Sequence, residues 1–280
     1  MTTTLTLLAC LVAGAAAVRS TWSPCGLSML STITPVAERA KGHRYGATCA
    51  WFIGGATVGG LALGALAAAL AAAMGAAGPS PVVAGGAALA AALVVLVSDR
   101  GRARVRIPVH YRQVNERWLD AYRPWVYGAG FGFQIGCGLA TYITTAAVYL
   151  VVVLTALTGD PAVALAVGAG FGLVRGLAVT LTRRVTTPSA LLELHRRVAR
   201  LLPWAERTVA AAVGVSAVVL AVATWPTSAA VVGAVAVVTV AVRLAIGERR
   251  AVAHRSGPDP SVGAPSVCAP SVGAPSVGVG

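Results

Sequence analysis

Seven long apolar segments dominate the sequence and limit the folds that it can adopt. They lie at about 4–36, 46–74, 81–98, 126–157, 161–182, 208–224 and 228–246. Most approach or exceed the ~20 residues that an α-helix needs to cross the hydrocarbon core of a bilayer. Charged residues make up 11% of the 280 residues, against ~25% in soluble domains. We therefore predict an all-α polytopic membrane protein with about seven transmembrane helices, and we exclude a water-soluble domain.

The basic residues are confined to alternate connections between these segments. The connections after the first, third, fifth and seventh segments hold nearly all of the 22 Lys and Arg residues, whereas those at 75–80, 159–160 and 225–228 hold none. Because cytoplasmic loops are enriched in Lys and Arg, we predict an integral cytoplasmic (inner) membrane protein with its N-terminus outside and its C-terminus in the cytoplasm. A cleaved signal peptide is the less favoured alternative, since no basic residue precedes Cys10.

Two further segments lie beside these spans. Residues 188–202 place leucines on one face and Arg196, Arg197 and Arg200 on another, which predicts an amphipathic helix on the inner leaflet. From Pro260 the chain repeats a PSVGA-like unit with a proline in every copy. We therefore predict a membrane domain over residues 1–247 and a disordered Pro/Ser/Val/Gly tail over 256–280.

A short motif occurs twice, once in each half of the chain. Cys25 to Thr32 aligns without gaps on Cys137 to Thr144, and Cys, Gly, Leu and Thr recur at the same offsets. Three predicted spans separate the copies, so the copies enter the membrane from opposite sides. We therefore predict two inverted three-helix repeats, at about 4–98 and 126–224, with one extra C-terminal helix at 228–246.

Each copy of the motif is preceded by residues that interrupt helices. The first segment is too long for one upright span, which predicts a discontinuous helix whose second half has Ser23 as N-cap and Pro24 at its first position. Cys25 then lies at a helix N-terminus, which favours the thiolate, while apolar burial opposes it. In the second copy, four glycines are predicted to break the helix before Cys137. They are Gly128, Gly130, Gly132 and Gly136.

On these residues the chain resembles the CcdA/DsbD family of transmembrane thiol–disulfide electron carriers. The resemblance covers about residues 8–224 and rests on Ser23-Pro24-Cys25 and on Cys137, with Gly136 where the family usually has proline. It implies that the two cysteines face each other at the bilayer midplane and form an intramembrane disulfide when oxidised. It further implies a cytoplasmic thioredoxin-like donor and an extracytoplasmic thioredoxin-like acceptor, of the kind that serves cytochrome c biogenesis.

Two arginines join the candidate site. Arg175 lies inside the fifth segment, where a charged group is a functional candidate by default. Its side chain could instead extend to the cytoplasmic interface near Arg183. Arg19 would favour a Cys25 thiolate if it turned inward, and the outer interface is its alternative location. Besides Cys25 and Cys137, the predicted site residues are Ser23, Pro24, Gly26, Gly136, Gly138, Arg19 and Arg175.

The remaining patterns predict no cofactor, metal or nucleic-acid site. No predicted span carries a carboxylate well inside it, and all four histidines lie in connections, which argues against a proton relay or a hard-cation path. Glycine clusters such as Gly168 to Gly172 predict close helix packing, and Cys10 and Cys49 are expected to be small buried apolar residues. The predicted function is the transfer of reducing equivalents across the membrane, and whether the protein is a thiol–disulfide oxidoreductase stays open. The alternatives are a small-solute or soft-metal transporter on the same scaffold and a structural or assembly factor.

Overall fold

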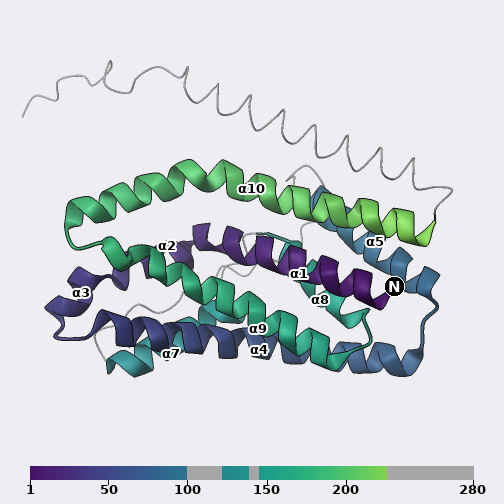
Figure 1. Ribbon diagram of the computed structural model, residues 1–280, viewed down its shortest axis with the longest axis horizontal. Coiled ribbons are helices and arrows are strands. Elements are labelled where there is room, and N and C mark those ends of the chain that lie inside the picture. Colours follow the sequence, from purple (N-terminus) through teal and green to yellow (C-terminus); the bar gives the residue numbers. More distant parts are fainter. Residues whose placement is uncertain (100–121, 139–144, 226–280) are drawn as a thin grey trace, which may run out of the picture. The chain divides into compact units, whose positions relative to one another are not determined.

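The computed structural model describes residues 1–99, 122–138 and 145–225, and over these ranges the regular elements are all helical (Figure 1). Five stretches of helix are long and apolar enough, by length and composition, to cross a membrane. They are Thr2–Trp22, Tyr45–Ala77, Pro81–Ser98, Pro161–Arg184 and Pro188–Thr224. The prediction of a helical membrane protein is therefore confirmed in its coarser form. The predicted seventh span at 228–246, most of the loop at 100–123 and the tail lie outside the described residues.

The first apolar segment is a broken helix, as predicted. Helix α1 (Thr2–Arg19) continues through a short 3-10 turn, η1 (Ser20–Trp22), and α2 (Pro24–Thr32) begins after the break. Ser23 has an extended backbone, and its hydroxyl accepts a 3.0 Å hydrogen bond from the amide of Gly26. This cap satisfies the amide of Gly26, which has no acceptor within the helix, and Pro24 at the first position has no amide hydrogen that would need one. The break is therefore encoded locally by Ser23-Pro24.

The fourth apolar segment is also broken, but not where the glycines predicted. Helix α7 (Pro124–Gly136) runs without interruption through all four of them, and α8 (Ala147–Ala156) follows. Gly128, Gly132 and Gly136 instead face α4 (Tyr45–Ala77), and a Cβ at Gly136 would overlap the carbonyl oxygen of Ala56. The prediction of a break before Cys137 is therefore wrong, because glycines spaced by four residues form one packing face of an intact helix.

Helix α4 (Tyr45–Ala77) packs main chain to main chain against both α7 and α9 (Pro161–Leu177). A Cβ at Gly132 of α7 would overlap the carbonyl oxygen of Phe52, and one at Gly172 of α9 would lie 2.8 Å from the Cα of Gly60. Neither contact leaves room for a side chain. The predicted packing role of the glycine clusters is confirmed, and α4 joins the helix that ends at Cys137 to the helix that carries Arg175.

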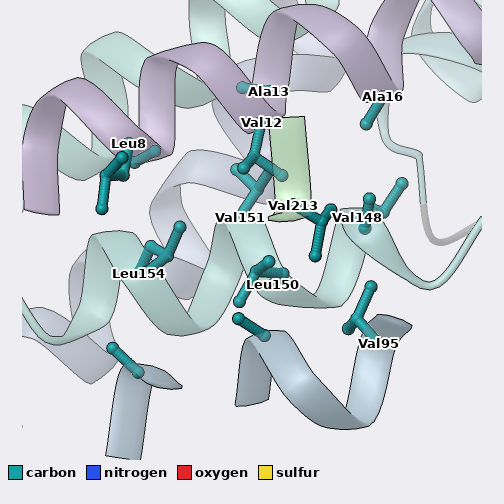
Figure 2. Close-up of a cluster of buried hydrophobic side chains, with 14 of the residues drawn as sticks. Leu8, Val12, Ala13, Ala16, Val95, Val148, Leu150, Val151, Leu154 and Val213 are labelled. Carbon is teal, nitrogen blue, oxygen red and sulfur yellow. The ribbon is translucent and has the colours of Figure 1, made fainter. Parts of the chain in front are cut away.

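A cluster of buried apolar side chains lies between α1, α8, α5 (Pro81–Ser98) and α10 (Pro188–Thr224). Figure 2 shows its aliphatic side chains, which come from all four helices and include Leu8, Val12, Val95, Leu150, Val151, Leu154 and Val213. These side chains are aliphatic, so van der Waals packing between them stabilises the association of these helices in a membrane. This cluster holds α1 and α8. Helix α1 lies across the first break from α2, and α8 lies across the second break from α7.

Helix α10 differs from the prediction. A separate amphipathic helix at 188–202 and a span at 208–224 were expected, but α10 is continuous across Pro203. The first part is not free on a surface, since the indole Nε1 of Trp22 donates to the carbonyl oxygen of Val198 at 2.6 Å. His195 Nε2 also lies 3.3 Å from the Ser31 hydroxyl. The short helix α3 (Pro35–Ala40) and the 3-10 helix η2 (Ala178–Arg184) complete the described elements.

Candidate functional site

Cys25 lies at the start of α2 inside an apolar cluster. It is 2% exposed, and its neighbours in the cluster include Met29, Phe52 and Phe131. The turn that carries it is tightly packed, because a Cβ at Gly26 would overlap the carbonyl oxygen of Thr21. The cap from Ser23 and this contact hold the first turn of α2, and with it the thiol, against η1.

Cys137 lies at the opposite end of its helix, as the C-cap of α7, and is partly exposed. Gly138 follows with a φ of +67°, a left-handed conformation that favours glycine at helix C-termini. The two copies of the repeated motif therefore differ in structure, since the equivalent Gly26 is helical. The chain leaves α7 immediately after the thiol, so Cys137 sits at the break of the fourth segment.

Arg175 lies within electrostatic range of both cysteines. Its guanidinium interacts electrostatically with both Cys25 and Cys137. The side chain is 3% exposed and lies over the ring of Phe171, 5.5 Å from its centroid. A Cβ at Gly138 would lie 3.5 Å from Arg175 Nη1, which places the end of α7 against this side chain. The structure thus brings together three predicted site residues that are distant in the sequence.

The guanidinium of Arg175 is incompletely paired. Its Nε and Nη2 atoms are buried without a hydrogen-bond partner among the described residues. Leaving charged donors unpaired in a low-dielectric interior is costly, and a cation–π contact of this kind compensates only in part. Arg175 is therefore a buried cation with which no carboxylate of the described residues pairs.

The other predicted cation has a different partner. Arg19 Nη2 lies 3.2 Å from Glu206 Oε1 on α10, so its charge is compensated there. Cys49 is buried as expected, whereas Cys10 is exposed, contrary to expectation. Cys10 lies on a face of α1 that no described helix covers. The location of a cysteine in an apolar segment therefore did not predict whether it is buried.

A buried polar cluster, which the sequence analysis missed, lies near the connection between α3 and α4. Glu38 is 1% exposed, and its carboxylate accepts hydrogen bonds from the hydroxyls of Thr48 and Tyr127, the latter at 2.7 Å. His43 Nδ1 lies 3.9 Å from Glu38 Oε2 and 3.4 Å from the Tyr127 hydroxyl. The cluster ties α3, α4 and α7 together. The combination of one acid and one histidine in the connection at 37–45 was the only signal for it in the sequence.

Comparisons with known proteins identify relatives. The methylamine utilization protein MauF of Paracoccus versutus is 32% identical over 221 residues, which cover 76% of this chain and 78% of the relative. A protein of the same name from Paracoccus denitrificans is 32% identical over 184 residues, 61% of this chain and 63% of the relative. No protein-family model and no solved structure matches. This identity over most of both chains shows that the chain belongs to the MauF family.

Proposed function

We propose that this protein carries reducing equivalents across the cytoplasmic membrane by dithiol/disulfide exchange between Cys25 and Cys137. The observation that supports the proposal is that one buried cation, Arg175, lies within electrostatic range of both thiols, although they come from different helices. Each thiol also lies at a helix break, where the backbone can adjust more easily than inside a continuous helix.

The helix packing supports an inverted repeat, which such a carrier would use. If the first three apolar segments are exchanged with the next three, and α8 is taken as the counterpart of α1, the contact of α1 with α9 becomes that of α8 with α4, and both pairs pack. The contact of α1 with α10 likewise becomes that of α8 with α5, and again both pairs pack. The pairs α4–α9, α5–α10 and α1–α8 map onto themselves. With the extra span at 228–246, this scheme has seven spans, and the basic connections orient the N-terminus outside.

The proposed exchange is balanced in atoms and electrons. A thiolate of the reduced protein attacks a disulfide of an extracytoplasmic thioredoxin-like partner, forming a mixed disulfide and releasing one partner thiolate. The second thiol of the protein, as thiolate, then attacks the mixed disulfide, closing the Cys25–Cys137 bond and releasing the other partner sulfur. Two electrons and two protons reach the partner. A cytoplasmic thioredoxin-like dithiol reverses the oxidation by the same two steps.

The relatives are named for methylamine utilization, so we propose that the acceptor serves that process. Disulfide formation requires Cα atoms within about 4.4 to 6.8 Å, and the break at Ser23, which precedes Cys25, is where the chain can adjust to reach this distance. The activity would then be that of a thiol–disulfide oxidoreductase without a bound cofactor.

The test is the thiol state of each cysteine in membranes. Wild-type protein and the Cys25→Ser, Cys137→Ser and Cys49→Ser variants are alkylated with and without prior reduction, and modified peptides are counted by mass spectrometry. We expect oxidation to protect Cys25 and Cys137 together in wild type and in Cys49→Ser, and to protect neither in the other two variants. Free alkylation of both thiols under oxidising conditions would refute the carrier and favour small-solute transport on the same scaffold.

A further inference from the structure

The unpaired guanidinium nitrogens of Arg175 would be stabilised by a nearby anion. The side chain is 97% buried, being 3% exposed, and Nε and Nη2 find no acceptor among the described residues. An ionised side chain in this setting is normally paired. A counter-charge must therefore come from a nearby acid or from a small anion in solution.

The carboxylates of the described residues are engaged elsewhere. Glu38 is held by Tyr127 and Thr48, Asp99 by Thr145, Asp160 by the first turn of α9, Glu193 by Arg197 and Glu206 by Arg19. Residues 139–144, which connect α7 to α8, include no Asp or Glu. Among the described residues, the ionisable groups that act on Arg175 are the two thiols.

The two thiols are not equivalent in their surroundings. Cys25 lies in the first turn of α2, where the helix dipole favours a negative charge. Cys137 lies at the C-terminal end of α7, where the helix dipole disfavours it. Cys25 is buried, whereas Cys137 is partly exposed. The field of Arg175 and that of the helix therefore act together only at Cys25, and access is better at Cys137.

We propose that Arg175 and a Cys25 thiolate form an ion pair in the reduced protein, and that Cys137 is the sulfur that forms mixed disulfides. The division of roles between the sulfurs rests on the proposed carrier function, whereas the ion pair does not. When a donor thiolate attacks Cys137 in the oxidised protein, the Cys137–Cys25 bond breaks and Cys25 leaves as the thiolate that Arg175 stabilises. A better stabilised thiolate is a better leaving group. In the opposite direction, the same thiolate attacks the mixed disulfide at Cys137.

The ion pair is tested in protein that cannot carry electrons. Cys25 is retained, the other cysteines are replaced by serine, and the rate of iodoacetamide alkylation in proteoliposomes is followed at neutral pH. An opposite charge nearby changes the ionised fraction by about 10- to 1,000-fold, and the more basic thiolate recovers about half of this on a logarithmic scale through higher nucleophilicity. We expect Arg175→Gln to slow alkylation by about 3- to 30-fold.

Two variants separate charge from structure. Arg175→Lys retains the charge and should react within about threefold of the parent rate, and Arg19→Gln, which removes an arginine paired with Glu206, should react like the parent. The deficit of Arg175→Gln should vanish at strongly alkaline pH, where the thiol is ionised in every protein. Equal rates in Arg175→Gln and parent, or a deficit that persists at alkaline pH, would overturn the ion pair.

A companion measurement tests the division of roles. In full-length protein with the partner disulfide present, Cys25→Ser should accumulate a mixed disulfide on Cys137, and Cys137→Ser should not accumulate one on Cys25. The reverse pattern would overturn the assignment of the two sulfurs while leaving the carrier function standing. If neither variant traps a partner but the alkylation rates still depend on Arg175, the carrier function fails and the ion pair holds.

Discussion

Gly172→Ala should separate α9 from α4 and destabilise the protein. A Cβ at this position would lie 2.8 Å from the Cα of Gly60 and would overlap the carbonyl oxygen of Ala56, whereas ordinary Cβ contacts begin at 3.4 Å. The helices must therefore move apart by at least about 0.6 Å, the difference between these two distances. The obstructing atoms are main chain, so no side-chain rotation relieves the overlap.

The loss of stability caused by Gly172→Ala can be bounded. Overpacking of this kind costs about 1 to 3 kcal/mol, and a gap of this width weakens the neighbouring dispersion contacts by roughly a quarter or more. The gain in helix propensity from glycine to alanine, up to about 1 kcal/mol, offsets part of it. For a chain of this size, 1 kcal/mol corresponds to about 2–4 °C in Tm. We expect Gly172→Ala to lower Tm by several degrees.

The matched control lies two residues away on the same helix. A Cβ at Gly170 would meet nothing within 4 Å, so Gly170→Ala should leave Tm unchanged or raise it slightly. Both variants are purified in the same detergent and unfolded thermally with a tryptophan or thiol-reactive fluorescent readout. If Gly172→Ala proves as stable as Gly170→Ala, the close main-chain contact between α4 and α9 is refuted.

Two further predictions concern the polar groups that hold the ends of these helices. Glu38→Gln removes the buried charge that accepts two hydroxyl hydrogen bonds and should lower the free energy of unfolding by about 1–3 kcal/mol, whereas Glu206→Gln, at a 58% exposed side chain, should cost less than about 1 kcal/mol; equal thermal shifts in detergent would contradict this order. Ser23→Ala removes the cap of α2 and should cost about 1 kcal/mol, with faster hydrogen exchange at the amide of Gly26; unchanged exchange there would show that the cap does not hold the turn.

The sequence predicts the features that depend on neighbouring residues. The break at Ser23-Pro24 follows from a capping hydroxyl and a proline at the first helical position, and the structure has both. The apolar segments predict the long helices because length and hydropathy suffice for them. The error at α7 arose because glycine has two roles. A spacing of four residues, as in Gly128, Gly132 and Gly136, indicates a packing face rather than a break.

The contacts between distant segments could not be predicted in the same way. No pattern near Glu38 in the sequence predicts Tyr127 as its partner, since their contact depends on how α7 packs against α4. The absence of a carboxylate beside Arg175 likewise becomes visible only when each described acid is traced to its own partner. Pairing of this kind is a property of the tertiary structure, and one sequence carries little information on it.

The glycine seams of α4 have a mechanical consequence. Where two backbones touch without intervening side chains, neighbouring helices cannot slide by swapping rotamers, so α4 and its partners α7 and α9 act as a stiff frame. A Cβ at Gly59 of α4 would lie 2.8 Å from the main-chain nitrogen of Cys137, so this cysteine belongs to the frame, whereas Cys25 follows the extended backbone of Ser23. A small rotation at Ser23 would therefore swing the Cys25 thiol while the frame, with Cys137, stays still.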